Sequence, residues 1–210
     1  MRFLCISDIH GHHDALCAVL REGTDRGFDQ LVVCGDLCFP GPEPLAVWKT
    51  LLEHRALCVQ GIGDRALGLL DPHKLSATDP EQKARLKRLR EVHDELGQLI
   101  IARLGKLPTI ASLPLESGHT MLVVHGSPRD PAEPMTEDMN EDELIALLGD
   151  EPGDLIICGA SHVAFERVVA DVHIVSVGSV GEAPGGGYAQ ATLIDATAQG
   201  AEVSQFTVKL

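Results

Sequence analysis

Residues 2–16 read RFLCISDIHGHHDAL, and this stretch decides the fold class. The apolar run at its start ends in the polar turn SDIHG, and a helical pattern begins at about residue 13. An apolar strand that leads through a turn into a helix is typical of an α/β protein. Further apolar runs, each ending in a turn that carries Gly or Asp, are QLVVCGDL (30–37), ALCVQG (56–61), TMLVVHG (120–126) and DLIICGA (154–160).

The rest of the chain alternates with these runs and then changes character. Helical patterns are predicted at about 13–22, 43–53, 80–104 and 140–149, and another helix starts after GIGD (61–64). From about residue 163 onward, RVVADVHIVSVGSV, YAQATLIDA and AEVSQFTVKL predict a closing set of antiparallel strands.

Length and composition bound the organisation of the chain. With 210 residues, 44 % of them hydrophobic, one domain over 1–210 is expected, with 70–108 as a helical insertion or cap. The N-terminal residues hold an arginine and an aspartate within the first eight positions, which excludes a signal peptide there and predicts a cytoplasmic protein. Six cysteines without a C-x-x-C pair are expected to be reduced core thiols.

Charge limits the partners that the chain can bind. The formal net charge of −14 argues against a nucleic acid duplex or a membrane surface. Ten acidic residues and no lysine or arginine fall within 130–154, which we call the acidic segment. A solvated surface is the simpler interpretation of this segment, and docking of a basic protein partner is the alternative.

Unusual polar residues follow the predicted strands. Because the carboxyl ends of strands share one edge of an α/β sheet, these side chains are expected to meet in one crevice. Aspartate and histidine together suit a divalent cation such as Mn, Fe or Zn. Helix capping or a turn is the alternative role for any one of them. The residues concerned are Asp8, His10, Asp36, Asp64, His125 and His162.

The motifs resemble those of a known family, the calcineurin-like metallophosphoesterases, in particular their small bacterial phosphodiesterase-like branch. The resemblance implies a four-layer αββα sandwich, in which two mixed β-sheets are flanked by helices, and metal-dependent hydrolysis of phosphoesters. It runs nearly end to end and rests on SDIHGHHDAL (7–16), GDLCFPGPEP (35–44), GIGDRAL (61–67), LPLESGHTMLVVHGSPRD (113–130), ICGASH (157–162) and SVGSVG (176–181).

Residue by residue, the resemblance assigns Asp8, His10, Asp36 and His162 to a first metal, with Asp36 bridging to a second. His125 matches one ligand of that second metal. The family's other two ligands, an asparagine and a histidine, are Ile62 and Ala160 here, and Gly63 replaces the histidine that protonates the leaving group. One strongly bound ion is therefore expected, with a second ion weak or absent.

Two further residues are candidates for contact with a substrate. His12 follows the metal turn at the start of a predicted helix, where backbone N–H groups favour a phosphate, so it is a candidate for catalysis and for substrate binding. Arg65 is a candidate phosphate contact. A surface histidine and a solvated helix arginine are the alternatives.

These observations favour a phosphoesterase-like protein that hydrolyses or binds a small phosphomonoester or phosphodiester. The alternative is a weak or inactive pseudoenzyme, or a protein-interaction scaffold, on the same fold. Ile62, Gly63 and Ala160 put efficient turnover in doubt, because they replace the family's site residues.

Overall fold

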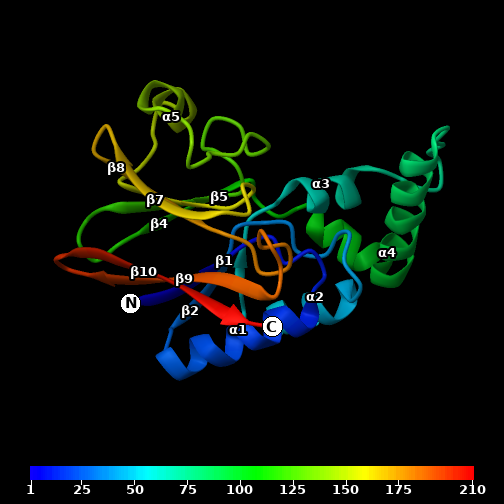
Figure 1. Ribbon diagram of the computed structural model, residues 1–210, viewed down its shortest axis with the longest axis horizontal. Coiled ribbons are helices and arrows are strands. Elements are labelled where there is room, and N and C mark those ends of the chain that lie inside the picture. Colours follow the sequence, from blue (N-terminus) through cyan, green and yellow to red (C-terminus); the bar gives the residue numbers. More distant parts are fainter.

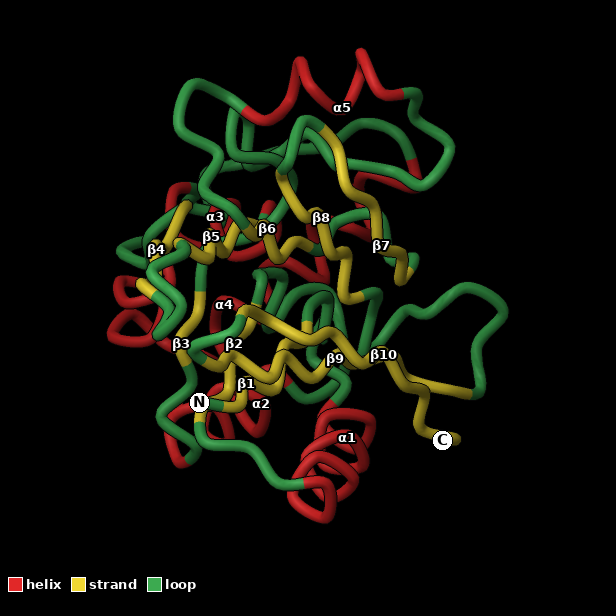
Figure 2. Tube along the Cα trace, turned by 90° about the vertical axis from the view of Figure 1, so that its left-hand side faces the viewer, coloured by secondary structure: helices red, strands yellow, loops and turns green.

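The computed structural model describes residues 1–210, which form two stacked five-stranded sheets with helices outside them. Figure 1 shows the two sheets one above the other, with α1 and α2 below, α5 above, and α3 and α4 to one side. The view along the strands in Figure 2 separates the layers as helix, sheet, sheet, helix. The α/β sandwich with two mixed sheets that the sequence predicts is confirmed.

The first sheet has the strand order β10-β9-β1-β2-β3. β1, β2 and β3 run parallel, while β9 pairs antiparallel with β1 and with β10. The carboxyl ends of β1 and β2 therefore lie side by side. Its strands are β1 (Arg2–Ile6), β2 (Gln30–Val33), β3 (Leu57–Cys58), β9 (Tyr188–Thr197) and β10 (Gly200–Lys209).

The second sheet has the order β4-β5-β6-β8-β7. β5, β6 and β8 are parallel, so the predicted closing set of antiparallel strands is wrong in part: β8 joins β6 in parallel, and the last two strands belong to the other sheet. The edge strand β4 was not expected. The strands are β4 (Ile110–Pro114), β5 (Thr120–Val124), β6 (Leu155–Cys158), β7 (Ala164–Val169) and β8 (Val172–Val177).

The helices lie where the sequence places them. α4 bends at Gly97, whose φ of 71° is not helical, and its buried side chains join the same core as those of α1 and α2. The 70–108 region thus packs on the main body through the inner face of α4. The helices are α1 (His13–Arg26), α2 (Pro44–Glu53), α3 (Ile62–Leu69), α4 (Pro80–Leu104) and α5 (Glu141–Leu148).

Strand alternation builds the core in layers. Phe3 and Cys5 of β1 face the second sheet, whereas Leu4 and Ile6 face the helices below. Successive side chains of a strand point to opposite faces, so a strand buried on both sides is apolar throughout. β5 and β6 divide their side chains in the same way between the inter-sheet layer and α5.

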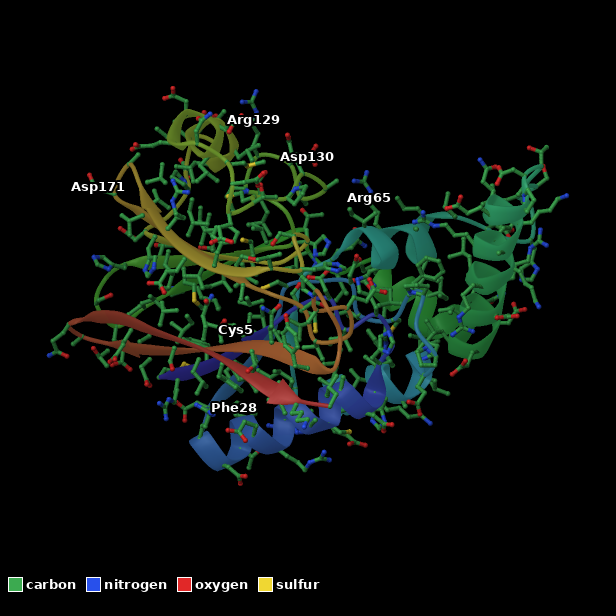
Figure 3. All side chains as sticks on the ribbon, in the orientation of Figure 1. Cys5, Phe28, Arg65, Arg129, Asp130 and Asp171 are labelled. Atoms are coloured by element: carbon green, nitrogen blue, oxygen red, sulfur yellow. The ribbon has the colours of Figure 1, made fainter.

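The cysteines are free thiols, as the sequence predicts. Figure 3 shows Cys5 between the sheets. Burial raises the pKa of Cys58 and of Cys158 to about 12, so both stay protonated at neutral pH. None of the helices combines the length and the apolar character that crossing a membrane requires.

The acidic segment is partly structural. The carboxylates of Asp130, Asp138 and Glu143 each accept a local hydrogen bond, and Asp154 accepts one from the Thr120 N–H at 2.7 Å. At the start of α5, Asn140 Oδ1 accepts from the Glu143 N–H at 3.0 Å, and Glu143 Oε2 accepts from the Asn140 N–H at 2.8 Å. This reciprocal capping box, with three acidic residues in the first turn, stabilises the helix N-terminus.

Replacing Asn140 tests this cap. Asn140→Ala should lower the free energy of unfolding by about 1 kcal/mol, because the first turn loses a side-chain acceptor. The measurement is urea denaturation followed by circular dichroism. Glu151→Gln, at an exposed position with no hydrogen bond, is the matched control and should stay within ~0.5 kcal/mol. Equal stability of the two variants would contradict the cap.

Candidate metal centre

Five ligand-type side chains meet where the two sheets adjoin. Their ligand atoms form two groups, one from Asp8, His10 and His162 and one from Asp8, Asp36 and His125, and within each group the atoms lie within 4.8 Å of one another. Asp8 and His10 follow β1, Asp36 follows β2, and the two other histidines follow β5 and β6. The expected convergence of strand ends therefore occurs, with ligands supplied by both sheets.

The first group has the spacing of a shared cation. His162 Nε2 lies 3.2 Å from Asp8 Oδ1, and His10 Nε2 lies 3.6 Å from the same oxygen. The two Nε2 atoms are 3.3 Å apart. Ligands at about 2.0–2.2 Å from one ion stand roughly 3–3.5 Å from each other, so these three atoms can hold a divalent cation.

The second group also includes Asp8, together with Asp36 and His125. His125 Nε2 is 3.5 Å from Asp36 Oδ2, and that oxygen is 3.9 Å from His10 Nε2. The other oxygen of Asp36 accepts from the Gly63 N–H at 2.6 Å. Asp36 therefore reaches ligands of both groups through Oδ2, and Asp8 is the residue that the two groups have in common.

The protein groups fit a metal ion chemically. Asp8 Oδ1 is buried and has no hydrogen-bond partner, although it points between two imidazoles. His10 Nδ1 donates to the Phe39 carbonyl at 2.6 Å, and His125 Nδ1 donates to the Cys34 carbonyl at 2.7 Å. Since a carbonyl only accepts, each neutral ring turns the lone pair of Nε2 toward the centre, which is how metal-ligating histidines are usually oriented.

The backbone at the centre is strained. Asp8, His10, Asp36, Ala160 and His162 all have a φ between 49° and 59°, a region that non-glycine residues rarely occupy. Each such conformation costs of order 1–3 kcal/mol and tends to occur at functional sites. The strained backbone conformations are thus concentrated at the strand ends that carry the ligand atoms and at the nearby Ala160.

The electrostatics reflect mutual attraction among these groups. Burial alone would raise the pKa of Asp8, but His10 and His162 hold it well below its usual range. Burial alone would lower the pKa of His10 and of His125, yet the contacts of His10 with Asp8 and of His125 with Asp36 raise each to about 9. The carboxylates and imidazoles of the centre therefore favour positive charge between them.

Asp64 has a structural place instead. It is fully buried, and its two oxygens accept from the N–H groups of Leu37 at 3.1 Å and Gly61 at 3.0 Å. Burial and the nearby Asp36 raise its pKa to about 7. Asp64 thereby joins the turn after β2 to the start of α3 and belongs to neither group of ligands.

Glu182 is a site residue that sequence reasoning missed. Its Oε2 lies 3.7 Å from His10 Nε2 and 3.7 Å from His162 Nδ1 at the rim of the centre. It directly follows SVGSVG (176–181), so its place next to that motif was the available signal.

Residues 1–199 match the model of the calcineurin-like phosphoesterase superfamily domain. The chain belongs to this superfamily. Among curated proteins, none matches the chain. Solved structures share the sandwich. A hypothetical protein from Pyrococcus horikoshii has a TM-score of 0.82 at 21 % identity, covering 99 % of this chain and 88 % of that chain.

Two further solved structures carry phosphoesterase names. The metallophosphoesterase from Sphaerobacter thermophilus has a TM-score of 0.76 at 23 % identity, covering 100 % of this chain and 89 % of its own. YfcE, a phosphoesterase from E. coli, has a TM-score of 0.54 at 18 % identity, covering 100 % of both chains. At these identities the likeness shows the fold, and the superfamily membership rests on the family match.

The two candidate substrate residues lie outside the groups of ligands. His12 precedes α1 beside Gly181 and lines a separate hollow with Glu43 and Lys209, which none of the five ligand-type side chains lines. Arg65 is exposed on α3, and Figure 3 shows its side chain projecting away from the ribbon. Neither residue contacts a proposed metal ligand through a hydrogen bond or an ion pair.

Ile62, Gly63 and Ala160, which the sequence predicts to weaken a second metal site, lie close to the centre. Gly63 and Ala160 donate their N–H groups to Asp36 and Asp8, the latter at 3.1 Å. Ile62 is the first residue of α3, and 48 % of it is exposed. The loops after β3 and β6 thus contact the carboxylates of Asp36 and Asp8 through backbone N–H groups, at positions whose side chains cannot bind a metal.

Cation binding should release protons. At pH 7 the pKa of about 9 keeps His10 largely protonated, and contact with Asp8 also raises the pKa of His162, so an ion bound by both rings must displace at least about one proton. Affinity should then rise with pH up to about 9, rather than level off above the ordinary imidazole range. Calorimetric titration in two buffers of different ionisation enthalpy measures the proton number. A heat that is the same in both buffers would contradict this prediction.

Proposed function

We propose that the chain is a metal-dependent phosphoesterase that acts on a small phosphomonoester or phosphodiester, with one strongly bound divalent ion. The observation that supports this most is the unpartnered, buried Asp8 Oδ1 between two imidazoles, in a chain of this superfamily. Asp8, His10, Asp36 and His162 would hold the strong ion. His125 and Asp36 would hold a second ion weakly or not at all.

The protein residues have separate tasks in this proposal. A divalent ion at this position supplies Lewis-acid chemistry and lowers the pKa of a water ligand. Asp8 and Asp36 neutralise its charge, and the Nδ1 hydrogen bonds of His10 and His125 fix the rings. Gly63 has no proton donor to offer a leaving group, so esters with activated leaving groups should react fastest.

A weak or inactive pseudoenzyme is the second candidate, and the replacements Ile62, Gly63 and Ala160 favour it. A protein-interaction scaffold remains the third. Six carboxylates of the acidic segment are exposed and make no hydrogen bond or ion pair. They would be available to a basic protein partner, whose docking there stays a prediction. These residues are Glu133, Glu137, Glu141, Asp142, Asp150 and Glu151.

Removing a bridging carboxylate tests the proposed centre. Asp36→Asn should reduce bound Mn²⁺ below one ion per chain and should lower hydrolysis of an aryl phosphodiester at least about 10²-fold, because metal and charge are lost together. Elemental analysis and a nitrophenolate assay measure the two effects.

A matched control distinguishes metal bound at the proposed centre from metal bound by surface side chains. His73, His93 and Asp94 also bring ligand atoms together, on the cap. His73→Ala should leave both the hydrolysis and the number of tightly bound ions unchanged. Wild-type protein without metal, or loss of metal only in His73→Ala, would contradict the proposed centre.

Restoring the missing side chains tests why the second ion is weak. The triple variant Ile62→Asn, Gly63→His, Ala160→His should bind close to two ions and hydrolyse the diester about 10²-fold faster, because it regains ligands and a proton donor. The gain should be non-additive, since these groups serve one ion and its reaction.

The fit of the new side chains can be judged beforehand. A Cβ at position 63 would lie 3.2 Å from Asp36 Oδ1, which requires a shift of a few tenths of an ångström. Leu69→Asn, on an exposed face of α3, is the matched control and should change neither readout. A folded triple variant with unchanged metal content would show that these replacements do not set the stoichiometry.

A further inference from the structure

Two hollows meet beside the metal centre. One, of about 550 Å³, is lined by His10, Asp36 and Glu182 and by residues of α4. The other, of about 310 Å³, lies between α3 and α4 and is mostly apolar. Both are lined by Phe39, Ile62, Gly63 and Arg85, so the polar and apolar hollows are adjacent and share one wall.

The apolar hollow gathers exposed aliphatic side chains. Ile62, Leu70 and Leu75 are 48 %, 43 % and 39 % exposed, and all three line it. Large apolar groups that share one concave surface usually mark a binding site, because covering them removes apolar area from water. Ile62 lines both hollows and gives the apolar one its wall toward the metal centre.

The shared wall also carries a free cation. Arg85 is exposed and makes no ion pair or side-chain hydrogen bond. Arg88, nearly one turn later, is already engaged: it donates to the carbonyls of Pro40 and Gly41 and pairs with Glu91 at 3.1 Å. Arg88 thus holds α4 against the site. Arg85 stands where an anion spanning the two hollows would pass.

We propose that the hollow between α3 and α4 is the subsite for an apolar ester group, so that the substrates are phosphoesters carrying an aryl or compact alkyl group. This rests on the proposed function, because the phosphate would bind at the metal centre. A cavity of about 150 Å³ accepts one benzene ring, so 310 Å³ accommodates a two-ring group. Esters whose second group is a polar sugar would bind less well.

Phosphonates test this subsite without turnover, because their P–C bond is not hydrolysed. Calorimetry on the Mn²⁺-loaded protein should show naphthylmethylphosphonate binding roughly tenfold or more tightly than methylphosphonate. Leu75→Ser, which removes an apolar wall, and Ala77→Trp, which fills the hollow from a loop, should both reduce that ratio and leave methylphosphonate affinity unchanged.

Two further variants separate the contributions. Arg85→Gln should weaken both phosphonates by a similar factor, because it acts on the anion they share. Leu99→Ser, an exposed leucine of α4 outside the hollow, is the matched control and should change neither affinity. Equal affinity of the wild-type protein for the two phosphonates overturns the subsite, as does a preference that survives both Leu75→Ser and Ala77→Trp.

The subsite and the proposed hydrolysis can fail separately. Hydrolysis of aryl and polar esters at equal rates, together with no phosphonate preference, overturns the subsite and leaves the phosphoesterase. A naphthyl preference in a metal-loaded protein that hydrolyses none of these esters supports the subsite and overturns the hydrolysis.

Discussion

The buried carboxylate of Asp8 is the constraint on which the rest of the structure depends. A buried charge is costly unless neighbouring groups compensate it. The Asp8 N–H donates to Gly35, its carbonyl accepts from Ser179 and Gly181, and its Oδ2 accepts from Ala160. Asp8 is thus hydrogen-bonded to the segments that follow β2, β6 and β8. The remaining oxygen faces two imidazoles, where an ion or protons must balance it.

Close backbone approach makes this arrangement possible. A Cβ at Gly61 would lie 2.2 Å from the Asp36 backbone nitrogen, and one at Gly159 would lie 1.9 Å from Ser7 Oγ. The loops after β3 and β6 can therefore lie against the carboxylate turns only as glycine. Gly61 and Gly159 are therefore requirements of packing, whereas the side chains of the neighbouring Ile62 and Ala160 carry no ligand atom.

Local patterns predicted most of the fold and the convergence of Asp8, His10, Asp36, His125 and His162, because a buried strand and the turn that follows it are formed by adjacent residues. β4 was missed: it is an edge strand with alternating exposure, bounded by Pro108 and Pro114, and it has no apolar run. The split of the last strands between two sheets was missed too, since pairing partners depend on long-range packing. Glu182 and Arg85 reach the site only through the placement of a loop and of α4. The placement of α4 has no signal in the residues near Arg85, whereas Glu182 at least lies directly after SVGSVG (176–181).

The pairing of β1 with β9 sets an order of events for the nascent chain. Phe3 pairs with Ile194, and His10 meets His162 across 152 positions of sequence. Contacts between such distant residues form late, because their loop-closure entropy is lost before they stabilise the chain. During synthesis β1 can pair with β2 early, but its pairing with β9 waits for nearly the whole polypeptide. The group of Asp8, Asp36 and His125 needs the chain as far as the end of β5, and the group of Asp8, His10 and His162 needs it beyond β6, so no N-terminal fragment ending before His125 can bring either group together.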